Sequence, residues 1–373
     1  MKQYKLLEIT IQYENFIRQF YQYHTDISNL SYDELFTEIV ENCFAESDFI
    51  HRQLNEMGIE SKVVFYNNRN LQDKWCPHQK NISYFEILLL QIKDFMPDVI
   101  MISDICFFSQ NETIAIKDCL GSKKIKLIGY HFTTLTDSFK KNAILYDQIY
   151  TGNKVYLNFM KNIGLPSYLL RHAFEPSILD KIAKYNEKNE ICFLGSIIVG
   201  ENAHSNRLEL LDAMIKSKIP YTFYGNIYGQ IQEVIASEKG KKYINIIAGI
   251  AKDMKKEVFG TKYYTIMSQH KICLNMHGMF MDYGAGNMRM FEATGIGACL
   301  LTDLRSENSE LFDVDREIVV YDSLNDMVEK AKWLLDNPKR AKQIALAGQK
   351  KTLEKYTYRH KAEQLNEYIQ KIL

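Results

Sequence analysis

The chain has 373 residues, a length that suits two domains better than a single hydrophobic core. Hydrophobic residues make up 46% of it and charged residues 25%, which excludes a disordered or fibrous protein. Lysine plus arginine and aspartate plus glutamate number 46 each, so no overall basic charge would attract nucleic acid or an acidic membrane surface.

The cysteines and the hydropathy pattern indicate in which cellular compartment the protein is located. The seven cysteines are an odd number and no two of them have the spacing of metal ligands, which favours reduced thiols. No apolar stretch approaches the ~20 residues that cross a bilayer. Glu8 and Glu14 interrupt any signal-peptide pattern. We therefore expect a cytoplasmic protein with no transmembrane segment.

Strands alternate with helices through the first half of the chain. We expect strands at 5–11, 61–66, 97–103, 124–130, 147–150 and 168–171, and helices at 13–23, 31–57, 83–95, 111–120 and 154–163. This alternation predicts right-handed βαβ units and a parallel sheet, in which ligands bind at the carboxyl ends of the strands. Asp104 and His131 each directly follow an expected strand, so we expect both to face such a crevice.

A polar segment at residues 180–190 separates this half from a second βαβ pattern. There we expect strands at 191–195, 221–225, 244–248, 271–276, 298–302 and 317–321, and helices at 207–217, 263–268, 324–337, 338–347 and 358–372. Both halves are therefore expected to be α/β domains with parallel sheets.

The second half is organised around residues 284–303, which predict a glycine loop, a short helix, a glycine corner and a buried strand. Gly286 allows the backbone to approach a ligand closely. Asn287 can cap the helix, and Gly295 and Gly297 are expected to end it. The free N–H groups and the dipole at such a helix start favour an anion.

Two charged residues on this expected helix suit a nucleoside diphosphate. Arg289 carries a planar cationic fork that matches phosphate, and Glu292 is its neighbour on the helix surface. A carboxylate one turn from the arginine would suit ribose hydroxyls. The structural alternative is a capped helix with an internal Arg289–Glu292 pair.

Two further polar clusters follow strands of the second half. Gly195 and Ser196 come after its first strand, and Arg207 starts the next helix, so a phosphate could meet both glycine backbone and positive charge. His277 follows the strand at 271–276, where a structural role as a hydrogen-bonding side chain is the alternative. Because the carboxyl ends of parallel strands share one edge, we expect these clusters to line one pocket.

Several common catalytic motifs are absent from the sequence. It contains no Walker-type phosphate loop, no G-x-G-x-x-G after the first strand, no HExxH and no nucleophile elbow. These absences disfavour a kinase, a classical dehydrogenase, a zinc protease and an α/β-hydrolase. Nucleotide-sugar chemistry between two Rossmann-like domains fits best.

Four motifs of the second half occur together in an order typical of one group of enzymes. They are Phe193-Leu-Gly-Ser196, Tyr263-Tyr264, Gly286-Asn-Met-Arg-Met-Phe-Glu292 and Gly348-Gln-Lys-Lys-Thr352. With these motifs the chain resembles the CgeB-like (spore maturation protein) glycosyltransferases, a GT-B-fold group related to glycosyltransferase family 4. The resemblance covers most of residues 185–360, and the first 175 residues resemble the group more loosely.

The resemblance implies a GT-B architecture of two facing Rossmann-like domains with parallel sheets. The expected parts are an acceptor-side domain at 1–178, a nucleotide-sugar-binding domain at 186–355 and a C-terminal helix at 356–373 that returns to the first domain. It implies that Glu292 holds the donor ribose, and that Gly195, Ser196, Arg207, Asn287 and Arg289 surround the diphosphate. From their places after a strand and before the helix, we also expect His277 and Gly286 to contact the diphosphate or sugar. The larger family has a glutamate eight positions before Glu292, where this chain has Gly284, so the stereochemical outcome stays open.

The implied activity is a hexosyltransferase-type glycosyl transfer from a nucleotide-diphosphate sugar to a hydroxyl of a glycan, protein or small molecule. We expect neither a metal ion nor another cofactor, because arginines and helix N–H groups can stabilise the departing diphosphate. His131 and Asp104 are candidate catalytic bases, with Asp137 behind them, and strand-ending or helix-capping roles are the alternative. A nucleotide-sugar epimerase and a non-catalytic nucleotide-sugar-binding partner protein remain competing hypotheses.

Overall fold

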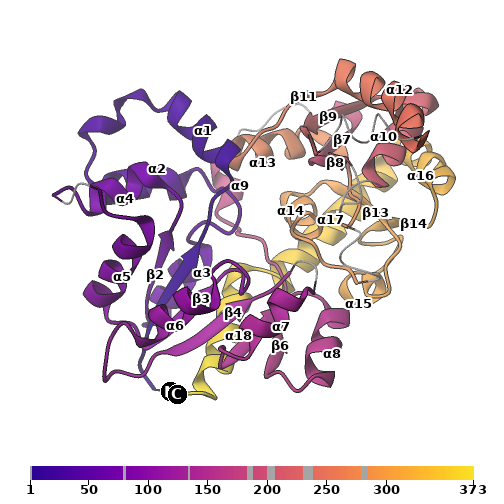
Figure 1. Cartoon of the computed structure of the whole chain (residues 1–373). Coiled ribbons are helices and arrows are strands. Elements are labelled where there is room, and N and C mark those ends of the chain that lie inside the picture. Colours follow the sequence, from indigo (N-terminus) through magenta and orange to yellow (C-terminus); the bar gives the residue numbers. More distant parts are fainter. Residues whose placement is uncertain are drawn as a thin grey trace. The chain divides into compact units, whose positions relative to one another are not determined.

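The computed structural model describes residues 2–78, 81–132, 135–182, 188–199, 206–229, 238–278 and 284–373. It divides the chain into two compact units, drawn with their elements in Figure 1. The first unit combines Met1–Arg171 with Tyr358–Leu373, and the second is His172–Thr357. Within the described ranges, no helix is long and apolar enough to cross a bilayer.

The first unit is built on a parallel six-stranded sheet in the order β2-β1-β3-β4-β5-β6. Its strands are β1 (Lys5–Thr10), β2 (Glu60–Phe65), β3 (Val99–Ile102), β4 (Lys126–Tyr130), β5 (Gln148–Thr151) and β6 (Ser167–Leu169). Its helices are α1 (Glu14–Tyr23), η1 (Thr25–Asn29), α2 (Tyr32–Glu41), α3 (Phe49–Glu56), α4 (Arg69–Trp75), α5 (Tyr84–Phe95), α6 (Gln110–Asp118), α7 (Asp137–Ala143), α8 (Lys154–Asn162) and α18 (Tyr358–Gln370). The parallel order places the loops after β3 and β4 side by side at one edge.

The helix at the end of the chain belongs to this first unit. The ring of Tyr358 on α18 lies 5.1 Å from that of Phe49 on α3, measured between centroids. Lys361 pairs with Glu46 at 2.7 Å, and Leu365 is fully buried. More than 180 residues of the second unit therefore separate α18 from the rest of the unit to which it belongs.

The single helix expected over residues 31–57 is wrong, because α2 ends at Glu41 and α3 begins only at Phe49. Cys43, Ala45 and Ser47 between them adopt positive φ angles of 59°, 53° and 46°. Such angles are unfavourable for residues with a side chain. The turn brings Phe44 onto Phe16 of α1, with ring centroids 4.1 Å apart. Aromatic packing thus stabilises a break that the apolar spacing did not reveal.

The second unit contains a second parallel six-stranded sheet, in the order β11-β9-β7-β12-β13-β14. Its strands are β7 (Lys188–Leu194), β9 (Tyr221–Gly225), β11 (Lys255–Lys256), β12 (His270–Leu274), β13 (Cys299–Asp303) and β14 (Val319–Tyr321), and β8 (Ile197–Val199) pairs separately with β10 (Ile227–Gly229). Its helices are α9 (Ile178–Lys181), α10 (Asn206–Ser217), α12 (Glu238–Asp253), α13 (Gly260–Ser268), α14 (Met288–Ile296), α15 (Asn308–Leu311), α16 (Leu324–Asp336) and α17 (Pro338–Lys355). The strand order reverses between β7 and β12, which is where ligands bind in such sheets.

The strand expected at 244–248 is wrong, because these residues lie within α12. Ile246 and Ile250 are both buried and stand four residues apart, which is the spacing of one helix face. Both belong to the core cluster that includes Met214 of α10. A short β-branched run therefore looked like a strand, although its buried positions follow the helical period.

Gly295 and Gly348 lie inside helices, although we expected from the sequence that the first helix would end at its glycine and the second just before it. Gly295 is within α14, where a side chain would come within 2.5 Å of the Phe174 ring. Gly348 is within α17, which continues to Lys355 rather than ending at Ala347, and a side chain there would overlap the carbonyl of Glu317. Both glycines provide room for close packing instead of ending a helix.

Candidate functional site

The start of α14 lies at the reversal point of the second sheet and has the predicted geometry. Gly286 adopts a φ of 97°, which a residue with a side chain rarely adopts. The Asn287 side chain then caps the helix by accepting a hydrogen bond of 3.3 Å from the backbone N–H of Met290. Gly297, with a φ of 83°, terminates the helix. The free N–H groups of α14 therefore start beside the ends of β7 and β12.

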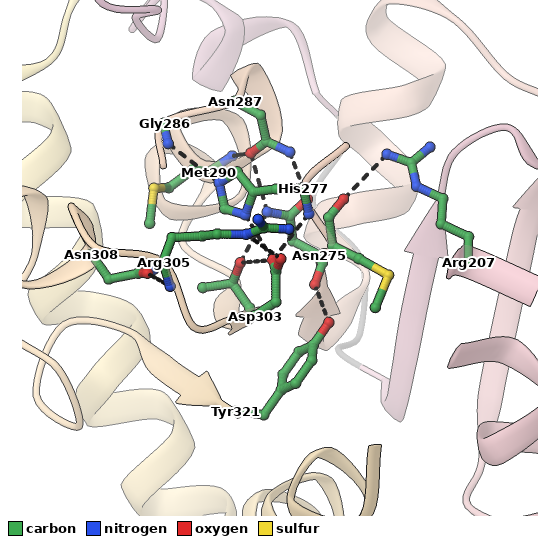
Figure 2. A network of polar contacts seen from close by, with 12 residues as sticks. Arg207, Asn275, His277, Gly286, Asn287, Met290, Asp303, Arg305, Asn308 and Tyr321 are labelled. Atoms are coloured by element: carbon green, nitrogen blue, oxygen red, sulfur yellow. Dashed lines mark hydrogen bonds and ion pairs between the residues drawn. The ribbon is translucent and has the colours of Figure 1, made fainter. Parts of the chain in front are cut away.

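A reciprocal amide pair fixes this helix start to the sheet (Figure 2). Asn275 follows β12, and its amide nitrogen donates to the side-chain oxygen of Asn287 at 3.1 Å. The amide nitrogen of Asn287 donates back to Asn275 at 3.0 Å. Asn275 also donates to Thr302 and accepts a bond from Tyr321. Because Asn275 is fully buried and bonded on all sides, the cap has one defined position.

His277 connects the glycine loop at Gly286 to Asp303 at the end of β13. Its ring is fully buried, Nδ1 lies 2.7 Å from Asp303 Oδ1, and Nε2 accepts a 3.2 Å hydrogen bond from the Gly286 N–H. This network places the ring proton on Nδ1. The structure thus shows His277 with both nitrogens bonded inside the protein.

Asp303 is the negative centre beneath this loop. Burial opposes its charge, but the hydrogen bonds from His277 and the positive charge of Arg305 hold the pKa of Asp303 well below its usual range. Arg305 Nε donates to the second carboxylate oxygen at 2.7 Å. The aspartate is therefore ionised at neutral pH and bonds on both of its oxygens.

Arg207, at the start of α10, is a buried arginine with donors left over. Its Nη1 donates to the Ser196 carbonyl at 2.8 Å and its Nη2 to the Met276 carbonyl at 3.2 Å. Its Nε is buried and has no hydrogen-bond partner among the described residues. Burial and the positive charge of Arg289 lower the pKa of Arg207 well below the usual arginine value, and the group still carries its charge at neutral pH.

Arg289 converges with Arg207 on Gly195. A side-chain carbon at Gly195 would lie 3.3 Å from Nη1 of both arginines. A side chain at Gly195 would require the guanidinium groups to shift by a few tenths of an ångström, so the glycine keeps both of them close to the backbone. Two like charges are held together here, an arrangement that an anion would stabilise.

Two tyrosines of α13 bond Glu292, and one of them also bonds Arg289. The Tyr263 hydroxyl accepts a 3.1 Å bond from Arg289 Nε and donates a 2.8 Å bond to Glu292. The Tyr264 hydroxyl donates to the other oxygen of Glu292 at 3.3 Å. Burial raises the pKa of Glu292, against the opposing effects of Arg289 and the two hydroxyls. The internal Arg289–Glu292 pair considered from the sequence is thus mediated by Tyr263.

In the first unit, the structure brings Asp104 and His131 together. They follow the neighbouring strands β3 and β4, and Asp104 Oδ1 lies 3.3 Å from His131 Nδ1. The His131 ring is fully buried and its Nε2 has no partner within the described ranges, whereas the Asp104 side chain is 37% exposed. Asp137 is exposed in the first turn of α7 and lies near Lys140.

Sequence reasoning placed most of these side chains but missed several of their partners. Gly195, Ser196, Arg207 and Arg289 gather in one cluster, and His277, Gly286 and Asn287 form the adjacent loop support. The roles of Asp303 and Tyr321 were missed, although both end strands of the same sheet. The position of each at a strand end was the available signal.

Solved structures identify the architecture. A glycosyltransferase from Rickettsia africae superposes with a TM-score of 0.60 at 11% identity, over 99% of this chain and 98% of that one. The fold is that of the GT-B glycosyltransferases. Anabaena HepE in complex with UDP and glucose has the same GT-B fold, with a TM-score of 0.59, 10% identity and coverage of 99% and 100%.

Two other comparisons cover a smaller part of the chain. The glycosyl transferase-like family model matches residues 207–367, less than half of the chain. A variant of S. aureus TarM in complex with UDP superposes with a TM-score of 0.56 at 12% identity, over 77% of this chain but only 59% of that longer one. No curated protein sequence matches the chain significantly.

Proposed function

We propose that this protein is a glycosyltransferase that moves a sugar from a nucleotide-diphosphate donor to an acceptor hydroxyl. The observation that carries the proposal is the pair of guanidinium groups at Gly195, beside the free N–H groups of α14. Two buried like charges need an anion, and a diphosphate supplies one with the matching geometry. The match of residues 207–367 to the glycosyl transferase-like family supports the same conclusion.

The diphosphate would occupy the space next to Gly195 and Ser196. Arg207 Nε is a buried donor without a partner in the ranges that the structure describes, so a phosphate oxygen can accept its hydrogen bond without breaking one seen there. His277 and Asn287 would act by fixing Gly286 and the first N–H groups of α14, rather than through free ring nitrogens. As the glycosidic bond breaks, negative charge grows on the leaving diphosphate, and both arginines already stand in place to stabilise it.

Glu292 would hold the ribose of the donor. Tyr263 and Tyr264 use two of its acceptor positions, and an ionised carboxylate offers about four. Two positions are then left for the ribose hydroxyls. The tyrosines also fix the carboxylate, so that little order has to be gained when the nucleoside binds.

Asp104 and His131 are the proposed base for the acceptor. Asp104 is the exposed member and would receive the proton, whereas the buried His131 orients it through Nδ1. Because the arginines can balance the diphosphate charge, we propose transfer without a metal ion or other cofactor. The narrower likeness to the CgeB-like group and to glycosyltransferase family 4 stays a prediction, as does hexosyl transfer.

A donor screen tests this function. UDP sugars come first, because HepE is in complex with UDP-glucose in a solved structure of the same fold. Ligands that bind only the native state raise its melting temperature, so we expect one class of nucleotide sugar to do so. That donor should then release its nucleoside diphosphate only when an acceptor is present. A sugar altered without any acceptor would indicate an epimerase, and binding without consumption across a broad acceptor panel would contradict the transferase.

A further inference from the structure

A third side chain meets Asp104 and His131 at the edge of the first sheet. Cys106, two residues after Asp104, brings its sulfur into this group, and one ligand atom from each residue lies within 4.8 Å of the others. The backbone N–H of Cys106 donates a 2.9 Å hydrogen bond to Asp104 Oδ1. A carboxylate oxygen, a thiol sulfur and an imidazole nitrogen therefore converge within one compact cluster.

The chain holds this cluster in place through the backbone. Strands β3 and β4 run parallel with Ile102 opposite Gly129, so the residues that follow them leave the sheet at the same level. Ile105 N donates to the Tyr130 carbonyl at 3.1 Å, which folds the loop after β3 over β4. A side chain at Gly129 would come within 2.7 Å of Tyr146 and would also overlap Ile105. The glycine thus makes the close approach of the two strand ends possible.

The three ligand types and their spacing suit a zinc-like ion. Zinc bonds of about 2.0 Å to nitrogen or oxygen and about 2.3 Å to sulfur put tetrahedral ligand atoms roughly 3.3–3.6 Å apart. Asp104 Oδ1 and His131 Nδ1 already lie 3.3 Å apart. In the part of the chain that the structure describes, no lysine or arginine forms an ion pair with Asp104, so its charge is available to a cation.

We propose that Asp104, Cys106 and His131 bind one thiolate-preferring divalent cation, such as Zn²⁺. On binding, the Cys106 thiol gives its proton to solvent and forms a sulfur–metal bond. The ring proton of His131 moves from Nδ1 to Nε2 by exchange with solvent, so that Nδ1 and Asp104 Oδ1 each donate one electron pair. A fourth position stays open to water, as in three-ligand zinc sites. The bound cation inhibits the enzyme, because it occupies the atoms of Asp104 and His131 that would otherwise take part in proton transfer. This consequence rests on their proposed role as the acceptor base.

Cobalt titration tests the site directly, because Co²⁺ takes the place of Zn²⁺ and is coloured. We expect the full-length protein to bind one equivalent of Co²⁺ with a near-ultraviolet thiolate-to-cobalt band, and Zn²⁺ to abolish the spectrum. Cys106→Ser should lose this band and bind Co²⁺ at least about 10-fold more weakly. Cys119→Ser, at the end of α6 and also partly buried, is the matched control and should keep the band.

Two outcomes would overturn the proposal. One is a wild-type protein without a near-ultraviolet cobalt band, and the other is a Cys106→Ser variant that keeps it. Asp104→Asn, which retains the thiol, should also weaken Co²⁺ binding at least about 10-fold, so the site stays testable if Cys106→Ser does not fold. These spectra need no nucleotide sugar. A protein that binds Co²⁺ through Cys106 but consumes no donor even after a chelator has removed the metal would therefore refute the transferase and leave the metal site standing.

Discussion

At the scale of single residues, the second unit keeps positive and negative charge in two adjacent layers. Arg207 and Arg289 flank Gly195, and Asp303 lies beneath the neighbouring glycine loop with His277 and Arg305. Among the described residues, Arg207 Nε has no hydrogen-bond partner, whereas both carboxylate oxygens of Asp303 are bonded. The layer of Arg207 and Arg289 is suited to bind a ligand, and the hydrogen-bonded layer around Asp303 is suited to hold the glycine loop in position.

The hydrogen-bonded layer around Asp303 leads us to predict that the stability of the protein depends on pH. Asp303→Asn should lower the free energy of unfolding at pH 6 by about 3 kcal/mol, because it leaves buried partners of the carboxylate uncompensated. The pKa of Asp303 is lower in the folded state than the ~3.9 of an unfolded chain, so the unfolded state binds the proton first. The wild-type protein therefore loses this stability as the pH falls below about 4.

Urea unfolding at pH 6 and pH 3.5 checks this prediction. The difference between wild type and Asp303→Asn should be smaller at pH 3.5. Asp336→Asn, at the exposed end of α16, should behave as wild type at both values. An Asp303→Asn variant whose stability falls with acid as steeply as that of the wild type would show that this carboxylate does not supply the effect.

At the scale of secondary-structure elements, α14 depends on glycine at two positions for different reasons. Gly286 provides the positive φ that starts the helix, and Gly295 provides space for Phe174 within it. The sequence revealed the first, because a cap residue follows a glycine loop. It misjudged the second, because the space needed by Phe174, more than a hundred residues earlier, leaves no local pattern.

Gly295→Ala should therefore destabilise the protein, although the same exchange usually favours a helix. The added methyl group would contact the Phe174 ring, and such overpacking costs about 1–3 kcal/mol. Gly249→Ala in α12 is the matched control, since its methyl group would meet only Ile215 at 3.9 Å. That variant should gain up to about 1 kcal/mol.

Thermal and urea unfolding of both variants measure the difference. Phe174→Leu combined with Gly295→Ala should recover part of the lost stability. If Gly295→Ala and Gly249→Ala changed the free energy of unfolding equally, the contact with Phe174 would not require a glycine at position 295.

Elements with strong local signals were predictable, and those set by distant contacts were not. The capping box of Ser83 and Glu86 marks the start of α5, and buried apolar runs mark β3 and β4. The break between α2 and α3 depends on Phe44 packing on Phe16, which sequence spacing does not show. The site followed the same rule: the arginines near the starts of α10 and α14 were evident, but the bridging role of Tyr263 depends on two elements meeting in space.

At the scale of the whole molecule, two sheets of the same type have separate cores, and α18 completes the first unit from the far end of the chain. Leu365→Ala removes a fully buried side chain from α18 and should cost about 3 kcal/mol. Hydrogen exchange monitored by mass spectrometry should then increase in β1 to β6 and stay unchanged in β7 to β14. Exposed Glu363→Ala is the control, and faster exchange in both sheets would contradict the assignment of α18 to one unit.

Calorimetric titration of UDP against uridine, on the wild type and Arg289→Ala, tests the central claim most directly. If Arg289 binds the diphosphate, its loss should weaken UDP binding by about 10- to 150-fold, the equivalent of about 1.5–3 kcal/mol for a charge-assisted hydrogen bond. Uridine binding should change little, and the exposed Arg316→Ala variant should bind both as the wild type does. Equal losses for UDP and uridine, or no loss for either, would contradict a diphosphate site at Gly195.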